Sequence, residues 1–258
     1  TFQLGESDDG EKLFSEMFPQ NSDRVKKQKK APLRVIIGNP PYSIGQKSAN
    51  DNAQNQSYPF LDKRIANTYA AESTAGLNKS LYDAYIKAFR WSTDRLMKNN
   101  ENGGIICFIS NGAWLDGNST DGFRKCLERE FSSIYVFNLR GNARTSGELR
   151  QKEAGNVFGG GSRTPIAITL LVKNSKEKSE KGTIHYCEID DYLSQQDKLS
   201  ILKKHGSISS PSMQWTPLQP NAEGDWISQR NDAFSTYTPL ESEKKFDLNG
   251  KSFFAAKS

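Results

Sequence analysis

The sequence predicts an α/β fold, a doubly wound sheet that ends in an antiparallel pair of strands at its edge. Short runs of apolar and β-branched residues alternate with segments of helical spacing, which is the order of parallel α/β sheets with right-handed crossovers. The run Gly104–Ser110 is almost continuously apolar, as in a strand buried on both faces. Ile166–Val172 follows the previous strand without a long helix between them, so we expect it to pair antiparallel at the sheet edge.

Local residue patterns place the individual elements. Apolar residues recur three and four apart between Leu81 and Leu96, which predicts a helix that Asn78 or Ser80 can cap. Residues 43–58 are mostly Asn, Gln, Ser, Lys and Asp, and this composition predicts a mobile surface loop that can act as a lid. In chain order we expect a strand at 35–37, a helix ending at 97, a strand at 104–110, a helix at 119–131, and strands at 132–139, 166–172 and 182–189.

The composition bounds the class of protein. The chain has 35 Lys and Arg against 30 Asp and Glu, a formal net charge of +5 that mildly favours a polyanionic partner. Its three cysteines stand singly, without metal-ligand spacing, which fits a reduced setting. No apolar run approaches the length of a membrane span, and residues 1–30 lack the pattern of a signal peptide. We therefore expect a cytoplasmic protein without a metal site.

The expected domain organisation has three parts. Residues 1–31 form a polar and basic N-terminal segment, 32–190 form the catalytic α/β region, and 191–258 form an extension in which the apolar pattern weakens. The basic cluster between Arg24 and Arg34 fits either a solvated helix or linker, or a patch that contacts phosphates. Because the chain begins at Thr1 without a methionine, we expect the fold to be incomplete at its N-terminus.

The stretch RVIIGNPPY at residues 34–42 places a polar and aromatic tip at the end of a strand. Two adjacent prolines prevent both a helix and a continuing central strand. In open α/β sheets, ligands bind at the carboxyl ends of the strands. There the Asn39 side chain and the Pro40 carbonyl offer two acceptors, and Tyr42 offers a face for stacking. This combination suits a planar ring with an exocyclic amine, such as adenine.

The tip Asn39-Pro40-Pro41-Tyr42 resembles the N/D/S-P-P-Y/F motif of DNA methyltransferases that modify the exocyclic nitrogen of adenine. Longer stretches are similar to the methyltransferase part of type ISP restriction enzymes and of related helicase-methyltransferase proteins. They are residues 80–96, 103–117, 131–149 and 158–174. The resemblance covers about residues 1–190 and implies a Rossmann-like methyltransferase sheet that uses S-adenosyl-L-methionine (AdoMet). In that family a nuclease, a DEAD/DEAH-type ATPase, the methyltransferase and a target-recognition domain share one polypeptide.

The resemblance also implies roles for the residues of the tip. Asn39, Pro40, Pro41 and Tyr42 would form the catalytic motif, in which Asn39 and the Pro40 carbonyl hold the amine of a flipped adenine and Tyr42 stacks on it. Asn39 and Leu81 would border the cofactor, although a core position on its helix suits Leu81 better. The amine lone pair would then face the methyl group of AdoMet, so positioning would provide most of the catalysis.

A second set of residues would contact DNA. Phe158 precedes a run of glycines where this family often presents another stacking ring, and a packing role is the alternative. Arg144, Arg150 and Arg163 would contact phosphates of the double-stranded DNA, or would be solvated loop charges.

The chain also departs from the family pattern. Such enzymes bind AdoMet through a Gly-rich turn and an acidic residue that lie upstream of the diproline motif in this arrangement, and neither is in the sequence. Walker A, DEAD-box and nuclease motifs are absent as well. We therefore expect the second half of a methyltransferase domain, with target recognition beginning after residue 190. Two alternatives stay open, namely a non-catalytic DNA-binding or scaffold module of the same protein, and a protein-glutamine methyltransferase, which shares this tip.

Overall fold

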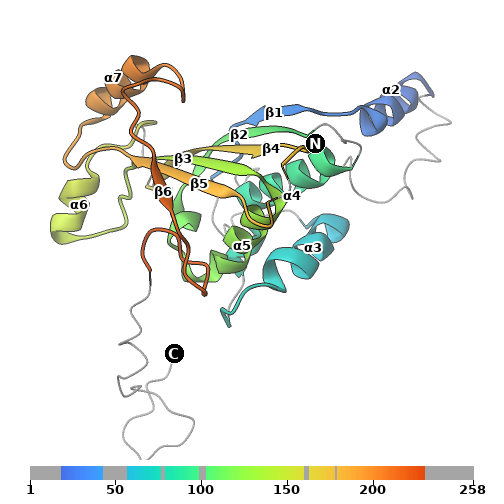
Figure 1. Cartoon of the computed structure of the whole chain (residues 1–258), viewed down its shortest axis with the longest axis horizontal. Coiled ribbons are helices and arrows are strands. Elements are labelled where there is room, and N and C mark those ends of the chain that lie inside the picture. The colour runs from blue at the N-terminus through green and yellow to red at the C-terminus, as the bar shows by residue number, and fades with distance from the viewer. Residues whose placement is uncertain are drawn as a thin grey trace, which may run out of the picture. The chain divides into compact units, whose positions relative to one another are not determined.

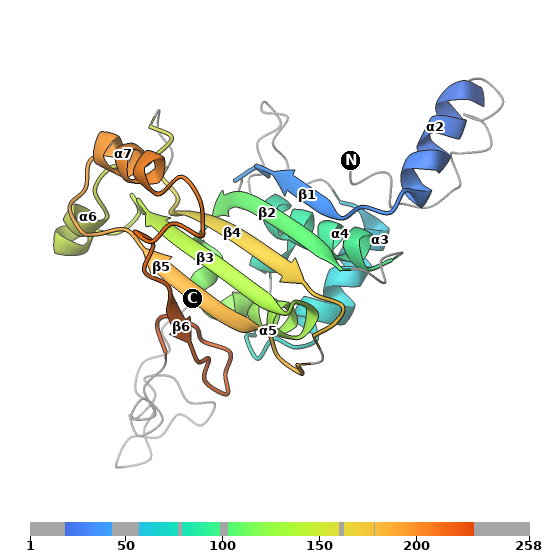
Figure 2. The ribbon, with the colours of Figure 1, turned by 45° about the horizontal axis from the view of Figure 1, so that its top comes forward.

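One six-stranded sheet organises the protein, whose computed structural model describes residues 19–42, 57–76, 79–98, 103–159, 163–177 and 179–229. The chain divides into two units, Thr1–Ile227 and Ser228–Ser258, and the sheet belongs to the first. Its strands are β1 (Val35–Gly38), β2 (Gly104–Asn111), β3 (Ser133–Arg140), β4 (Ile166–Lys173), β5 (Thr183–Glu188) and β6 (Thr216–Leu218). Figure 2 shows them in the spatial order β1-β2-β4-β3-β5-β6. The α/β class with a mixed sheet is confirmed.

The strand β4 runs antiparallel to β3, as the sequence predicts, but it does not lie at the edge. It is inserted between β2 and β3 and pairs antiparallel with both, while β1 pairs parallel with β2 and β3 with β5. The expected edge position was therefore wrong. The physical reason is burial, because Ala167, Thr169 and Leu171 of β4 are completely buried, whereas Val35 and Ile37 of the short strand β1 are 57% and 77% exposed.

The helices are arranged mainly on one face of this sheet. Figures 1 and 2 show α3, α4 and α5 against that face, α6 and α7 beyond the end of the sheet where β1, β2 and β3 finish, and α2 at the opposite end. Their bounds are α2 Pro19–Lys30, α3 Pro59–Ile65, α4 Ala84–Met97, α5 Asp121–Glu130, α6 Gly147–Glu153 and α7 Gln195–His205. None of the described helices is both long and apolar enough to cross a membrane.

The helix α4 begins later than the sequence predicts. Asn78 lies outside the described residues, and Ser80 lies in a short 3-10 helix, Lys79–Tyr82. The Ser80 hydroxyl is 2.6 Å from the Ser119 hydroxyl, so it serves a tertiary contact instead of a helix cap. Asp83, with extended backbone angles, is the residue that precedes the helix. The predicted loop 43–58 lies almost entirely outside the described residues.

The main core fills the space between the sheet and α3, α4 and α5. Phe89 of α4 is fully buried, and its ring lies 5.0 Å from that of Phe108 and 5.2 Å from that of Phe123, measured between centroids. Trp114 continues this aromatic cluster and meets the ring of Trp226 at 5.3 Å. Residues as far along the chain as Trp226 thus complete the same core, and β6 pairs with β5. The domain boundary expected at 190 stays a prediction.

A buried arginine ties the end of the described chain to this core. Arg124 on α5 is completely buried, and its Nη1 donates hydrogen bonds to the carbonyls of Trp114 at 2.8 Å and Gly117 at 2.9 Å. Its Nε donates to the carbonyl of Gly224 at 2.7 Å, and its Nη2 lies 3.3 Å from Asp225 Oδ1. One side chain thus joins the segment after β2 to the segment after β6.

We predict that Arg124→Met destabilises the protein strongly, because it leaves the buried Asp225 carboxylate and several carbonyls without this donor. The expected loss is about 3–5 kcal/mol of unfolding free energy. Arg129→Met is the matched control on the same helix, because the Arg129–Glu72 pair is about half exposed and should contribute no more than about 1 kcal/mol. Urea unfolding measures both variants, and equal losses would contradict the assigned role of Arg124.

Candidate active site

The tip follows β1 directly and is closely packed where it leaves the sheet. Gly38 pairs with Phe108 of β2, and a side-chain β-carbon at position 38 would lie 3.0 Å from the Phe108 ring. The two prolines that follow differ in burial, since Pro40 is buried and Pro41 is exposed. Asn39 is exposed at the carboxyl end of the strand. The turn therefore presents the Asn39 side chain on a backbone that the prolines restrict.

Tyr42 folds back onto this turn. Its hydroxyl donates a hydrogen bond to Oδ1 of Asn39 and lies 3.4 Å from the carbonyl oxygen of Ile109 on β2. Burial raises the pKa of Tyr42 to about 12, although the hydrogen bond to Asn39 acts in the opposite direction. The phenol is therefore protonated and remains a donor. An amine that binds Asn39 through the same lone pair has to displace the Tyr42 hydroxyl.

Phe158 meets Tyr42 from a distant part of the sequence. The ring centroids are 5.7 Å apart with an angle of 37° between the planes, and Phe158 is 46% exposed. Phe158 lies on the connection between β3 and β4, residues 141–165, which we call the aromatic loop. Asn156 shapes this loop, because its Oδ1 accepts the Phe158 N–H at 3.0 Å and its Nδ2 donates to the Thr164 carbonyl at 2.8 Å. Sequence reasoning missed Asn156, although an Asn before a glycine run is a turn signal.

The candidate arginines all lie on the aromatic loop. Arg144 and Arg163 are exposed, and neither forms an ion pair with a residue that the structure describes. The backbone joins their neighbourhoods, since the Ala143 N–H donates to the Arg163 carbonyl at 3.0 Å. Arg150 donates to the Ala154 carbonyl at 2.9 Å, at the end of its own helix. Contact of these three side chains with phosphates stays a prediction.

Leu81 belongs to a different packing cluster from Tyr42. It is completely buried in the core that α4 shares with the sheet. This is the packing position that the sequence also allows, and a contact between Leu81 and a cofactor stays a prediction. Asn111 ends β2, and its Oδ1 accepts the Ala113 N–H at 3.0 Å, which is a turn-forming role. Among the described residues, no three His, Cys, Asp or Glu side chains are arranged to hold a metal ion.

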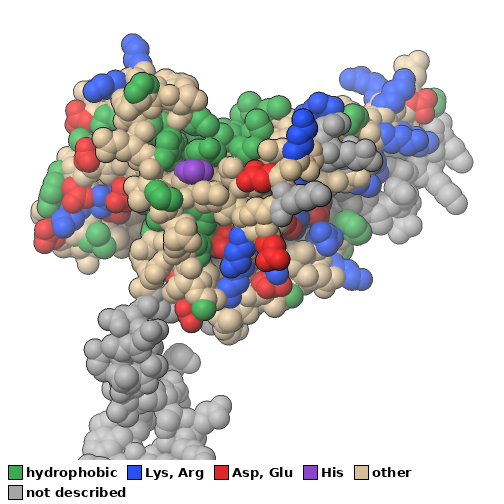
Figure 3. Space-filling model, in the orientation of Figure 1, with side chains coloured by type: hydrophobic (Ala, Val, Ile, Leu, Met, Phe, Trp, Pro, Cys, Tyr) green, Lys and Arg blue, Asp and Glu red, His purple; other side chains and the backbone are tan. Residues whose placement is uncertain are grey.

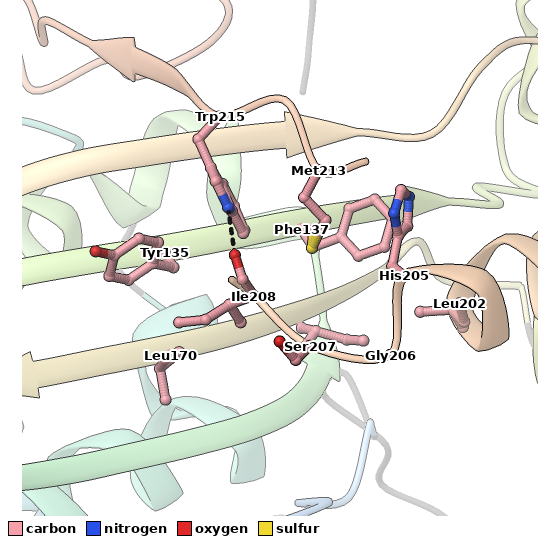
Figure 4. Close-up of a pocket in the computed structure, with 11 residues that line it drawn as sticks. Tyr135, Phe137, Leu170, Leu202, His205, Gly206, Ser207, Ile208, Met213 and Trp215 are labelled. Atoms are coloured by element: carbon pink, nitrogen blue, oxygen red, sulfur yellow. Dashed lines mark hydrogen bonds between the residues drawn. The ribbon is translucent and has the colours of Figure 1, made fainter. Parts of the chain in front are cut away.

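An apolar pocket of about 160 Å³ opens on the sheet face opposite α4, but it does not contain the tip. Figure 4 shows Trp215 and Met213 above it and the strands β3 and β4 below, with the Trp215 Nε1–H donated to the Ile208 carbonyl at 3.0 Å. His205, which also lines it, is 2.7 Å from the Ser212 hydroxyl. Hydrophobic side chains continue over the sheet between α7 and α2 in Figure 3. The lining of the pocket is almost wholly apolar, so we assign no reaction to the pocket.

The fold and the tip together define a class, the methylases of restriction-modification systems. The chain matches the family model described as Eco57I restriction-modification methylase over residues 3–142, and it belongs to this family. No curated protein matches the chain.

Solved structures of DNA-bound enzymes are similar to the chain. The nuclease-deletion mutant of the Type ISP restriction-modification enzyme LlaGI, in complex with a DNA substrate mimic, is 45% identical over 88% of this chain and 18% of its own, with a TM-score of 0.78. The ATP-dependent Type ISP enzyme LlaBIII bound to DNA is 37% identical over 95% of this chain and 16% of its own, with a TM-score of 0.82. The DrdV–DNA complex is 37% identical over 84% of this chain and 20% of its own, with a TM-score of 0.74. The chain thus spans a fifth or less of each relative.

We predict that Tyr42 stays protonated in the folded protein well above the ordinary tyrosine pKa of about 10. Its raised pKa of about 12 reflects a neutral form that burial favours, so the stability from this group is present below pH 10 and is lost as the pH rises toward 12. Phenolate absorbance measured against pH in the wild type and in Tyr42→Phe tests this. A difference between the two titrations near pH 10 would contradict the buried, hydrogen-bonded phenol.

Proposed function

We propose that this chain is the base-holding part of a site-specific DNA methyltransferase of the restriction-modification type. The reaction is transfer of a methyl group from AdoMet to the exocyclic amine of an adenine flipped out of duplex DNA. The observation that carries the proposal is the hydrogen bond from the Tyr42 hydroxyl to Oδ1 of the exposed Asn39, which brings an acceptor and an aromatic ring together at the tip. Membership in the methylase family and the likeness to DNA-bound enzymes support the DNA substrate.

The adenine amine would replace the Tyr42 hydroxyl on Asn39. The amine has two hydrogens, one for Asn39 Oδ1 and one for the Pro40 carbonyl, and both acceptors lie on the same rigid turn. With both hydrogens engaged, the nitrogen lone pair has one direction left free. Asn39 and Pro40 thereby orient the nucleophile, and no general base has to remove a proton before transfer. This is catalysis by positioning, which the residue set supports because the described part of the tip contains no ionised base.

Tyr42 and Phe158 would bind the base on their exposed faces. Two rings that sandwich a base need about 7 Å between them, twice a carbon–carbon contact of about 3.5 Å. The Tyr42 and Phe158 centroids are only 5.7 Å apart, so a base does not fit between them as they stand. The base would therefore stack on the outer face of Tyr42 and touch the half-exposed ring of Phe158 with its edge.

The methyl donor needs residues beyond those described. AdoMet supplies the electrophilic methyl group when bound, and Asn39, an exposed residue of the tip, would border it. The free edge of β1 supports the addition of a further strand, because β1 pairs only with β2 within the described residues and exposes Val35 and Ile37. We propose that other parts of the same polypeptide provide the cofactor turn, together with nuclease, ATPase and target-recognition domains.

Labelled methyl transfer tests this function and separates it from protein-glutamine methylation. AdoMet with a labelled methyl group is incubated with the full-length protein and either duplex DNA or a protein extract. Label in DNA supports the proposal, and label in protein alone would contradict it. A calorimetric titration with AdoMet separates the enzyme from a scaffold module, since the scaffold needs no AdoMet binding.

We predict that Asn39→Ala lowers kcat by about 10²–10³-fold, the usual effect of deleting one group that stabilises a transition state. Asn39→Asp is the matched control, because it keeps an acceptor at the same position. If Asn39→Asp lost as much activity as Asn39→Ala, the acceptor oxygen would not be the group on which catalysis depends. Near-normal methylation by Asn39→Ala would contradict the mechanism.

For Tyr42 we predict that the ring matters more than the hydroxyl. Tyr42→Ala removes a base stack and should raise KM for DNA by about tenfold or more. Tyr42→Phe keeps the ring and removes the group that competes with the amine for Asn39, so its KM should stay close to that of the wild type. Steady-state kinetics on one duplex compare the two variants, and equal increases in KM would argue against stacking.

A further inference from the structure

We propose that Gln195 and Lys198 of α7, which we call the α7 clamp, are positioning residues that hold Phe158 against Tyr42 for capture of the base. The inference rests on the proposed function and adds residues to it. Both side chains belong to the segment after residue 190, outside the region in which the sequence indicates catalytic residues. They lie one helical turn apart on α7 and so point to the same side.

Gln195 contacts the backbone on both sides of Phe158. Its Nε2 donates a hydrogen bond to the Val157 carbonyl at 3.0 Å. Gly159 lies against the same amide, since a β-carbon at position 159 would be 3.0 Å from Gln195 Nε2. Gly155 packs against the backbone of Gln195 at closer range, where a β-carbon would lie 2.5 Å from the Gln195 nitrogen. The aromatic loop therefore follows the start of α7 from Gly155 to Gly159.

Lys198 connects β3 to the first half of the aromatic loop. It is 1% exposed, and its Nζ donates to the Leu139 carbonyl at 3.0 Å and to the Glu153 carbonyl at 2.9 Å. Leu139 is the extra residue of a bulge in β3, because Asn138 and Arg140 pair with consecutive residues of β4. A bulged residue leaves the regular ladder, and here the lysine takes its carbonyl. Lys198 thus joins the end of β3 to the end of α6.

The segment just before α7 strengthens this attachment. The Gly155 N–H donates to the Leu193 carbonyl at 3.3 Å, and the Tyr192 N–H donates to the Lys152 carbonyl at 3.0 Å. Arg140 forms an ion pair with Asp191 and approaches Glu153 at 3.5 Å. In addition, Ser194 and Asp197 form a complete capping box at the start of α7, which fixes the backbone from which both clamp residues extend.

Backbone strain gathers in the same place. Among the described residues, the non-glycine residues with positive φ are Arg140 at 55°, Ala154 at 43° and Tyr192 at 62°. All three belong to the segments that the clamp joins, namely the end of β3, the end of α6 and the approach to α7. Residues keep such strained conformations only where many surrounding contacts hold them in place, and they are often found at functional sites. These backbone angles are independent of the hydrogen bonds, and they mark the same segments.

The test compares two clamp variants with two controls on the same helix. Gln195→Glu keeps the shape of the side chain but turns an acceptor toward the Val157 carbonyl, and a carboxylate in the first turn does not weaken α7. Lys198→Met keeps the length and removes both donors. Gln196→Glu and Lys203→Met make the same chemical changes at exposed positions of α7.

Hydrogen exchange in the full-length protein measures the attachment directly. The amides of Gly155, Phe158 and Gly159 are hydrogen-bonded to Leu193 or to Asn156. We expect both clamp variants to speed their exchange by about tenfold, as the loop opens locally more often. We expect the controls to leave exchange unchanged. Unchanged exchange in Gln195→Glu would overturn the clamp, and this variant decides the matter even where Lys198→Met fails to fold.

Kinetics on duplex DNA then test the function of the clamp. A loop that presents Phe158 poorly should raise KM for DNA by about tenfold, the scale of a lost base stack, and leave kcat within about twofold. Faster exchange with an unchanged KM would overturn the positioning role. If the wild type transfers no methyl group to DNA, the proposed function fails, and the exchange data alone still decide whether the clamp holds the loop.

Discussion

The insertion of β4 between β2 and β3 is the constraint on which the site depends. Because β4 runs antiparallel to both neighbours, the end of β3 and the start of β4 lie at the same end of the sheet, where Arg140 and Asn111 both pair with Ile166. The parallel strands β1 and β2 also finish there. The connection from β3 to β4 must therefore leave and return beside the tip of β1. This topology places the aromatic loop at the same end of the sheet as the tip, and Phe158 can therefore contact Tyr42.

The main acceptor of the tip is satisfied by a donor from the tip itself. Asn39 Oδ1 is bonded to the Tyr42 hydroxyl, which is protonated because burial holds the pKa of Tyr42 at about 12. Exchange of this donor for an amine conserves the number of hydrogen bonds on Asn39, so binding need not overcome a large desolvation cost at that atom. The prolines limit the rearrangement to side chains. Under the proposed function, this geometry would select a planar ring with an amine, with stacking as the second criterion.

Local patterns in the sequence were sufficient for the tip and for the strands around 104–110, 132–139 and 166–172, since β-branched runs, paired prolines and an Asn acceptor act within a few residues. They were not sufficient where distant contacts decide. The position of β4 depends on which strand pairs with a neighbour along both of its edges. Ser80, a predicted helix cap, instead contacts the Ser119 hydroxyl. The aromatic loop is held by Gln195 and Lys198, which follow it in the sequence. Lys198 illustrates the limit, because nothing near it in the sequence indicates that its ammonium donates to two distant backbone carbonyls.

The proposed function requires the Asn39 tip to select adenine for methylation. The most direct measurement is mass spectrometry of the nucleosides in DNA from cells that produce the full-length protein, compared with cells that produce Asn39→Ala. We predict N6-methyladenine with the first protein and its loss with the second. Methylated cytosine in place of N6-methyladenine, or equal N6-methyladenine in both samples, would contradict it.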